Sequence, residues 1–193
     1  SASTRLELLD SQTAPIPSRP KLHVDGRYLN DDNGNIVNLH GFTQTYSPFF
    51  NNSTWCNYGV VGCLKYNQGE IDALLSAGWK FDFVRLHMDP YWSDRLNCPH
   101  DGHTYRYEGH ECFDENRFRN ALHTVFIPLA EYAISKGMYV FMRPPVVSPH
   151  QIAVGDDYFA YLMQVWTLVA QHPKSRGNDK IMFELANEPI DIV

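Results

Sequence analysis

Alternating apolar and polar positions predict β-structure where the folded part of the chain begins. Residues 1–20 contain Ser, Thr and Pro without periodicity, so we interpret them as a leader or linker. In 22–29 and again in 36–41, apolar and polar residues alternate on either side of the turn-forming run 30–35. This pattern predicts a β-hairpin whose second arm contains the first strand of the main sheet, at 37–41.

The next part of the chain predicts a loop, a helix and a strand. A long loop, 42–66, is rich in Asn and aromatic residues. Asn67 to Glu70 is typical of a helix capping box, and Gly78 stands where the helix would stop. The segment 81–88 then alternates, which places Val84, Leu86 and Met88 on one face and Phe83, Arg85 and His87 on the other. We expect helices on the apolar face of this strand and functional groups on its other face.

A second helix is predicted from Asp114 to Gly137. Asp114 is a favourable N-cap residue, and Gly137 fits the stop position. Between them, apolar residues recur at spacings of three and four: Phe118, Leu122, Val125 and Leu129. Pro128 lies inside this run and should kink the helix, because it has no N–H to donate. The apolar segment 138–142 follows as a short strand that ends before Pro144-Pro145.

One more helix and strand complete the pattern. Asp156 and Asp157 start a helix that Pro173 closes. Its apolar face consists of Phe159, Leu162, Trp166 and Val169. The segment 180–186 is the last predicted strand. Strands that alternate with helices predict an α/β fold with a parallel sheet, and four strands with three helices make half of a (β/α)8 barrel, which takes about 250 residues when complete. We assign 21–193 to the N-terminal half of such a barrel.

Composition narrows the classes of function. The net charge is -6, and 22 acidic residues face 16 basic ones, which argues against a nucleic-acid partner. No apolar run approaches the roughly 20 residues that span a bilayer. Aromatic residues make up 13% of the chain, many of them in loop-like stretches. Their flat faces suit sugar rings, although aromatic residues that cover strand ends would give the same composition.

The cysteines and histidines do not predict a metal site. The four cysteines are spaced too widely for zinc-binding pairs: Cys56, Cys63, Cys98 and Cys112. A Cys98–Cys112 disulfide would fit a secreted enzyme, and free thiols would fit a reducing compartment, so both remain open. His40 and His87 lie at strand ends, but neither has a partner at metal-ligand spacing. We expect no metal and no cofactor.

The most informative motif is Asn187-Glu188-Pro189, at the end of the last apolar strand. Ligands gather at the carboxyl ends of strands in parallel sheets and barrels, so a carboxylate at that edge is placed for catalysis. A helix cap or a surface turn would explain the tripeptide by itself.

The surrounding sequence favours catalysis. The run 183–189, Phe-Glu-Leu-Ala-Asn-Glu-Pro, resembles the fourth-strand signature of glycoside hydrolase family 5, the cellulase A family of retaining β-glycanases. Val84-Arg-Leu-His-Met, Leu39-His-Gly-Phe and the N-terminal hairpin extend this resemblance over residues 22–190. The resemblance implies a TIM barrel whose base is closed by the hairpin. It also implies an enzyme that is secreted or located at the cell surface or in the periplasm.

The resemblance implies roles for individual residues. Glu188 would protonate the leaving oxygen, and Asn187 would hold the sugar 2-hydroxyl. Arg85 suits a role beside an ionised nucleophile, with an ion pair to Glu184 as the structural alternative. His87 would bind a hydroxyl or a carboxylate, or serve the structure alone.

Further candidates follow the first three strands. Tyr46 and Trp92 are our choices for stacking on sugar rings, with loop packing as the alternative. Family members often carry a His near the end of the third strand, whereas this chain has Arg143 before two prolines. We expect Arg143 to contact substrate or a carboxylate there. The second Glu, expected after a seventh strand, and the aromatic platform after an eighth are absent from this chain.

We therefore predict a retaining endo-β-1,4-glucanase that acts on β-glucan polysaccharides or oligosaccharides. Glu188 would be its acid/base, and the C-terminal half of the barrel would supply the nucleophile. We expect the chain alone to be inactive, because it lacks one carboxylate and exposes two sheet edges. The alternatives are a β-mannanase or xylanase of the same clan, and a non-catalytic glycan-binding half-barrel that assembles with its own copy.

Overall fold

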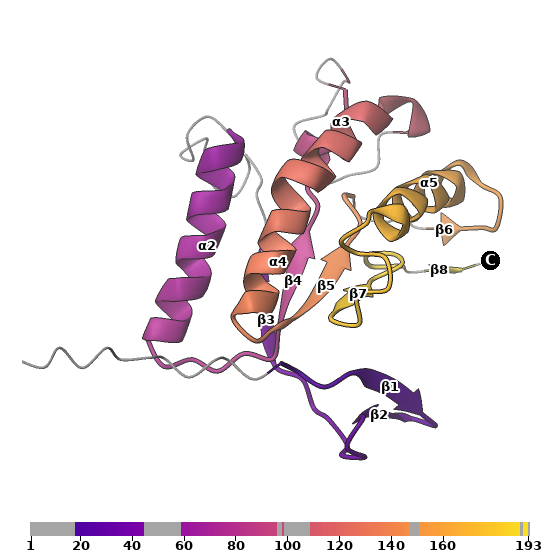
Figure 1. The fold of residues 1–193 in the computed structure, drawn as a ribbon. Helices are drawn as coiled ribbons and strands as arrows, with labels where there is room; N and C mark the ends of the chain where they lie inside the picture. Colours follow the sequence, from indigo (N-terminus) through magenta and orange to yellow (C-terminus); the bar gives the residue numbers. More distant parts are fainter. Residues whose placement is uncertain are drawn as a thin grey trace, which may run out of the picture.

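A four-stranded parallel sheet forms the centre of the molecule. The computed structural model describes residues 18–44, 59–95, 98, 109–146, 151–189 and 191–192. The sheet consists of β3 (Gly41–Gln44), β4 (Phe83–His87), β5 (Tyr139–Arg143) and β7 (Ile181–Phe183), in that spatial order. Neighbours along the chain are therefore neighbours in the sheet, and all the pairs are parallel, as predicted (Figure 1).

Helices fill the connections between these strands. They are α2 (Val60–Ser76), α3 (Glu115–Ala121), a π-helical segment η4 (Leu122–Phe126), α4 (Ile127–Ser135) and α5 (Asp157–Gln171). Helix α4 packs against α2 and lies along β4 and β5 (Figure 1). Two short 3-10 helices, η2 (Pro90–Trp92) and η3 (His110–Cys112), lie between β4 and α3. None of the helices in the described residues is both long enough and apolar enough to cross a membrane.

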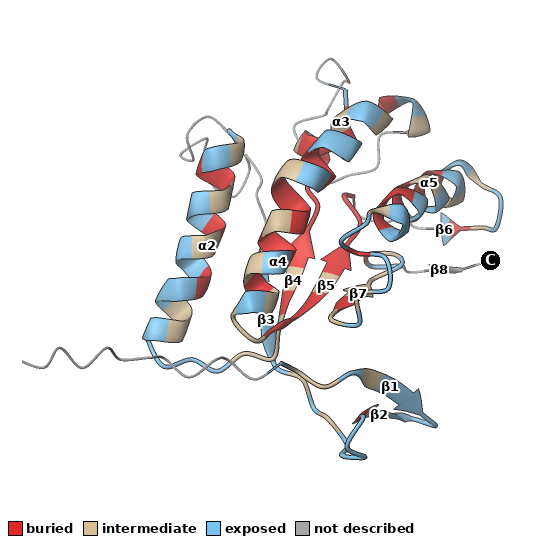
Figure 2. Cartoon of the chain, in the orientation of Figure 1, coloured by how far each residue is buried: buried red, intermediate tan, exposed pale blue. Residues whose placement is uncertain are grey.

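The two faces of the sheet differ as the alternation in β4 predicts. Val84 and Leu86 are buried in the core, and Val140 and Met142 lie opposite them on β5. Figure 2 shows β4 and β5 as the most buried part of the sheet. Arg85 pairs in register with Phe141 on the other face. Because paired residues of parallel strands share a face, the sheet separates a helix-covered apolar side from a side that carries polar groups.

The N-terminal hairpin forms, but its turn is not where the sequence pattern placed it. β1 (Leu22–Asp25) pairs with β2 (Tyr28–Asp31), so the reversal falls at Gly26-Arg27, within the predicted first arm. Gly26 has φ +59°, which suits Asp-Gly in a tight hairpin turn. The run 30–35, predicted to be the hairpin turn, forms a second turn in which Asp31 accepts the backbone N–H groups of Asn33 and Asn35, each at 2.9 Å.

The first strand of the main sheet lies a few residues later than predicted. The prediction of 37–41 was wrong, because the parallel pairing with β4 begins at Gly41 and runs to Gln44. Before it, the His40 carbonyl accepts the backbone N–H of Asp82, at 2.6 Å. Gly41 is needed here, since a Cβ would collide with the carbonyl oxygen and ring of Phe83. The apolar alternation of 36–41 is a local pattern. It does not indicate which residues pair with β4, and that pairing sets where β3 begins.

Helix α2 begins seven residues before the predicted capping box at Asn67. The predicted loop at 42–66 was therefore wrong at both ends, since it contains part of β3 and the first two turns of α2. Asn67 is buried inside the helix, where its Nδ2 donates to the Cys63 carbonyl at 2.9 Å. Its own carbonyl accepts a bond from the Gln44 amide at 2.9 Å. This contact from β3 explains why Asn67 is buried inside the helix, although the local sequence predicts that it caps the helix. The predicted stop at Gly78 is confirmed by its φ of +86°.

The helical run after Asp114 is continuous but changes its geometry. Asp114 caps α3 as predicted, with its carboxylate accepting the Arg117 N–H at 3.0 Å. Ahead of Pro128 the ladder widens into the π-helical η4, and α4 then continues to Ser135. Pro128 cannot donate a backbone hydrogen bond, and a π-turn is one way to absorb such a gap. The π-helical segment lies just before Pro128, and the kink expected at that residue stays a prediction.

Helix α5 starts as predicted but buries a slightly different face. Asp156 is its N-cap and accepts the Phe159 N–H at 2.6 Å. The buried residues are Tyr158, Tyr161, Leu162, Val165, Leu168 and Val169. Phe159 and Trp166, which we expected on this face, are only partly buried. A two-residue parallel pair, β6 (Gln151–Ile152) with β8 (Asp191–Ile192), follows the carboxyl ends of β5 and β7.

The amino ends of the strands are tied to the start of the described chain. Arg19 forms an ion pair with Asp82 at 2.6 Å and donates to the Gly137 carbonyl at 2.7 Å. The Tyr139 hydroxyl donates to the Pro20 carbonyl at 2.5 Å. Arg19, within the segment 1–20 that we interpreted as a leader, is thus in contact with the fold. Figure 1 shows the β1–β2 hairpin at this same end of the sheet.

Candidate active site at the carboxyl ends of the strands

The polar residues singled out in the sequence converge at one edge of the sheet. β4 ends at His87 and β5 at Arg143, and these two residues are paired in register. After β7 the chain stays beside β5 for one more residue, because the Glu184 N–H donates to the Met142 carbonyl at 2.9 Å. Since the strands are parallel, this edge brings together residues that are far apart in the sequence.

Arg85 organises this edge from the middle of β4. Its Nε donates to Glu184 Oε2 at 2.6 Å, and its Nη2 donates to Glu184 Oε1. The same Nη2 donates to Asn187 Oδ1 at 2.8 Å. These bonds to Glu184 are the main reason that the pKa of Arg85 is raised. The ion pair that the sequence left as an alternative for Arg85 is therefore formed.

This contact fixes the orientation of Asn187. A guanidinium group has donors and no acceptor, so the amide oxygen of Asn187 must face Arg85. The amide nitrogen then faces elsewhere. Asn187 is only 2% exposed, and its Nδ2 has no hydrogen-bond partner in the described structure. A buried donor without an acceptor is costly, by about 1–3 kcal/mol, so an acceptor bound at this nitrogen would be stabilising.

Glu188 differs from its neighbour in both exposure and backbone. It is exposed, and its φ of 53° makes it the one non-glycine residue with positive φ in the described part of the chain. Such a conformation is uncommon for a residue with a Cβ and is concentrated at functional sites. The negative charge of Glu188 favours the protonated forms of both Arg85 and Arg143. The carboxylate therefore acts electrostatically on the edge where those two side chains lie.

His87 is a buried, neutral donor. It is 5% exposed, and its Nε2 lies 2.9 Å from the Pro145 carbonyl. Because a carbonyl only accepts, Nε2 carries the proton. Burial, followed by the charge of Arg143, lowers the pKa of His87 from 6.5 to about 3. Of the two readings that we considered, the described contact is a structural one.

Arg143 is buried without a counterion. It is 7% exposed, and within the described residues its guanidinium makes neither a hydrogen bond nor an ion pair. Burial lowers the pKa of Arg143, and repulsion from Arg85 acts in the same direction. The charges of Glu184, Glu188 and Asp89 oppose this shift.

Of the two aromatic candidates for sugar stacking, the structure describes only Trp92. Trp92 ends η2, directly after β4, and is 7% exposed within the core cluster. Its ring meets that of Tyr91 edge-on, with centroids 5.1 Å apart. As placed, it packs against protein, which is the loop-packing alternative. Tyr46 lies outside the described residues.

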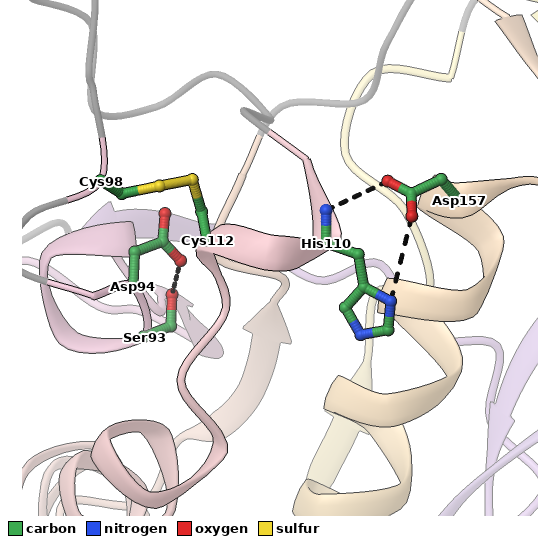
Figure 3. The surroundings of a disulfide bond; sticks show 6 residues. All are labelled: Ser93, Asp94, Cys98, His110, Cys112 and Asp157. Carbon is green, nitrogen blue, oxygen red and sulfur yellow. Dashed lines mark hydrogen bonds and ion pairs between the residues drawn. A yellow bond between two sulfur atoms is a disulfide. The ribbon is translucent and has the colours of Figure 1, made fainter.

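A disulfide between Cys98 and Cys112 joins the loop after β4 to the segment before α3 (Figure 3). This is one of the two possibilities left open by the sequence. Next to it, the His110 backbone N–H donates to Asp157 of α5 at 3.1 Å. Cys63 is a free, buried thiol whose pKa is raised by burial. Cys56 lies outside the described residues.

One residue of the edge was not singled out in the sequence. Asp89 follows β4, is fully buried, and accepts the Tyr91 N–H at 2.9 Å with Oδ1. Its signal was available, since Asp followed by Pro at a strand end favours a turn. Only the structure shows that its charge acts on Arg143.

Comparison with known proteins finds an endoglucanase and a cellulase. Over 177 residues the chain is 26% identical to Endoglucanase E-5 of Thermobifida fusca, in an alignment that covers 91% of this chain and 29% of that protein. The chain is similar to a known endoglucanase. Among solved structures, Cellulase Cel5C_n matches with a TM-score of 0.53 and 16% identity, covering 92% of this chain and 46% of that one. No family model matches the sequence.

These similarities support a cellulase-like fold for the chain. The structural match extends over nearly all of the chain, although its identity is low. The chain spans less than half of either protein.

Proposed function

We propose that this chain is part of a retaining endo-β-1,4-glucanase of glycoside hydrolase family 5 in which Glu188 is the general acid/base. The observation that carries the proposal is the pairing of Asn187 and Glu188 at the carboxyl edge of the sheet. There Arg85 fixes Asn187 so that a buried N–H is free to donate, and the next residue offers a carboxylate. Similarity to an endoglucanase and to a cellulase supports the same conclusion.

In the proposed reaction, Glu188 acts twice. As an acid it gives its proton to the glycosidic oxygen while a second carboxylate attacks the anomeric carbon and the bond to the leaving sugar breaks. As a base it then takes a proton from the water that releases the sugar from the covalent intermediate. The second carboxylate must lie about 5–5.5 Å from Glu188 for this double displacement.

The rest of the enzyme is part of the proposal. The four strands would be the first half of a (β/α)8 barrel, completed by a C-terminal half that supplies the second carboxylate. The protein would be secreted or held at the cell surface or in the periplasm, where a β-glucan polymer is accessible. A disulfide between Cys98 and Cys112 agrees with an oxidising compartment.

Asn187 would bind the sugar in the ring next to the cleaved bond. Its Nδ2 needs an acceptor, and a sugar hydroxyl oxygen provides one. Arg85 and Glu184 then act as positioning residues, because they hold the amide in the orientation that presents this donor.

The substitution Glu188→Gln in the complete polypeptide tests the acid/base role. We expect hydrolysis of carboxymethyl cellulose to fall about 10²–10⁴-fold, the usual contribution of general acid–base catalysis. Cellobiosides with a dinitrophenolate leaving group need no proton in the first step, so that step should survive in the variant. Glu131→Gln is a matched control, since Glu131 is an exposed carboxylate that pairs with Lys174 away from this edge.

Hydrolysis at the wild-type rate in Glu188→Gln would rule out the assignment. Parallel assays on mannan and xylan identify the polymer, because turnover of either in preference to β-glucan would replace glucanase by mannanase or xylanase. Binding of glucan without turnover by the complete wild-type polypeptide would favour a non-catalytic protein.

A further inference from the structure

We propose that Arg143 binds the second catalytic carboxylate and keeps it ionised, a role that we expected from the sequence for Arg85. This inference rests on the proposed function, since it concerns the partner carboxylate of Glu188. The ligand is a carboxylate of the protein itself, presented at the carboxyl ends of β4 and β5.

The burial of Arg143 without a partner is the first observation. Arg143 is 7% exposed, and its guanidinium forms neither a hydrogen bond nor an ion pair with the described residues. Its Nε lies fully out of reach of solvent. A buried charge is strongly unfavourable unless an opposite charge and hydrogen bonds compensate for it. An anion bound to Arg143 would therefore compensate for its buried charge.

Arg85 is already committed elsewhere. Its Nε and Nη2 are bound to the Glu184 carboxylate, and Nη2 is also bound to Asn187. A new carboxylate at Arg85 would have to compete with a two-point ion pair. Arg143 has no hydrogen-bond acceptor among the described residues, and a guanidinium can bind a carboxylate through two parallel hydrogen bonds.

The groups around Arg143 do not neutralise it. His87, its register partner on β4, is kept neutral by burial and donates to Pro145. Glu184 is paired with Arg85. Asp89 acts on Arg143 through its charge but is not bonded to it, and its Oδ1 caps Tyr91. Glu188 is exposed and acts on Arg143 only through its charge.

The position favours a carboxylate of the enzyme over an acidic substituent on the substrate. Arg143 ends β5, and the chain that leads to Glu188 is bonded to the preceding residue of β5, since the Glu184 N–H donates to the Met142 carbonyl at 2.9 Å. Double displacement requires a second carboxylate about 5–5.5 Å from Glu188. An anion held by Arg143 would thus lie at the same edge of the sheet as the acid/base. A neighbouring cation lowers the pKa of a carboxyl group by about one to three units, which keeps a nucleophile ionised in mildly acidic solution.

The test is the pH dependence of kcat/KM for a β-1,4-glucan oligosaccharide with the complete polypeptide. In Arg143→Gln we expect the acidic limb, which reports the nucleophile, to move upward by about one pH unit or more. Arg143→Lys keeps the charge, so its limb should stay nearer to that of the wild type while kcat falls. Arg119→Gln is the matched control, because Arg119 is an exposed arginine paired with Glu115 on α3, and its profile should not change.

An unmoved acidic limb in a folded Arg143→Gln protein would overturn the inference. So would a loss confined to uronic-acid-bearing oligosaccharides, which would make the substrate the bound anion. If thermal unfolding shows that Arg143→Gln does not fold, the test uses Arg143→Lys instead. Wild-type kcat and a wild-type pH profile in Arg143→Lys would then refute the role of Arg143. The result for Glu188→Gln distinguishes failure of the proposed function from failure of this inference. Activity that persists in Glu188→Gln would refute the proposed function. Loss of activity in Glu188→Gln, together with an unchanged acidic limb in Arg143→Gln, would refute only the role of Arg143.

Discussion

Adjacent residues at the end of the last strand differ because one is buried and the other is exposed. Asn187 is held by Arg85 and offers a single buried N–H, whereas Glu188 extends from a left-handed backbone position into solvent. A fixed hydrogen-bond donor such as Asn187 suits the binding of a sugar. An accessible carboxylate such as Glu188 suits the exchange of protons with that sugar.

His87 predicts how stability responds to acid. Its pKa in the folded state is about 3, below the ordinary 6.5, because burial disfavours the charged ring. Between these two values the unfolded chain takes up a proton that the folded chain refuses, so stability falls as the pH falls, by up to about 1.4 kcal/mol per pH unit. We expect His87→Gln, which keeps a donor for Pro145, to flatten this part of the curve.

Urea unfolding of both proteins at a series of pH values between these limits measures the effect. The difference between variant and wild type should shrink with acidification, or change sign in favour of the variant. A constant difference over the whole range would show that His87 is not neutral in the folded state. His123→Gln serves as a control, because His123 is exposed on η4 and lies away from this edge.

At the scale of elements, the loop between β4 and α3 is fixed from several sides. The disulfide closes it, the Arg95 N–H donates to the Cys112 carbonyl at 2.8 Å, and Asp94 forms an isolated bridge with Phe113. His110 connects the same segment to Asp157 of α5, as Figure 3 shows. The loop therefore joins two helices at the edge where the candidate site lies.

Removal of the disulfide should destabilise the protein without moving the catalytic edge. The cysteines are 14 residues apart, and closing a loop of this size is worth about 3 kcal/mol. We expect the double variant Cys98→Ser/Cys112→Ser to unfold at lower urea concentration by a corresponding amount. Reductant should bring the wild type to the midpoint of the variant and leave the variant unchanged. Equal midpoints for the oxidised wild type and the variant would show that the bond contributes no stability.

At the scale of the whole molecule, the sheet is open at both sides. β3 and β7 are its outer strands, and each pairs with one neighbour only among the described elements. A barrel removes such edges by closing on itself, whereas an open parallel sheet leaves backbone groups that invite association. The polar face that carries Arg85, His87 and Arg143 would form part of the barrel interior.

We expect the 193-residue chain produced by itself to lack glucanase activity and to self-associate as its concentration rises. In the proposed mechanism the second carboxylate lies outside this chain, which accounts for the first effect, and the open strand edges account for the second. Assays on carboxymethyl cellulose and light scattering, with the complete polypeptide as reference, measure both. Hydrolysis by the chain alone at the reference rate would contradict the proposal that the second carboxylate lies outside it.

The sequence determined the order and type of the main elements because their signals are local. Strand β4, the Asp114 and Asp156 caps and the stop at Gly78 each depend on residues within a few positions of one another. Alternation also identified which side of β4 carries the polar groups. The motif at Asn187-Glu188 could be recognised for the same reason, since its strand and its carboxylate are adjacent in the chain.

Tertiary structure decided what depends on distant partners. The start of β3 is set by pairing with β4, and Asn67 lies inside α2 because Gln44 and Cys63 satisfy it. Whether Arg85 or Arg143 remains available for an anion could not be read from sequence, because it depends on Glu184 being brought to β4 from 99 residues away. Hydrophobic periodicity indicates which side of one element is buried. The hydrogen-bond and ion-pair partners of its polar residues come from other strands, so only the tertiary structure determines them.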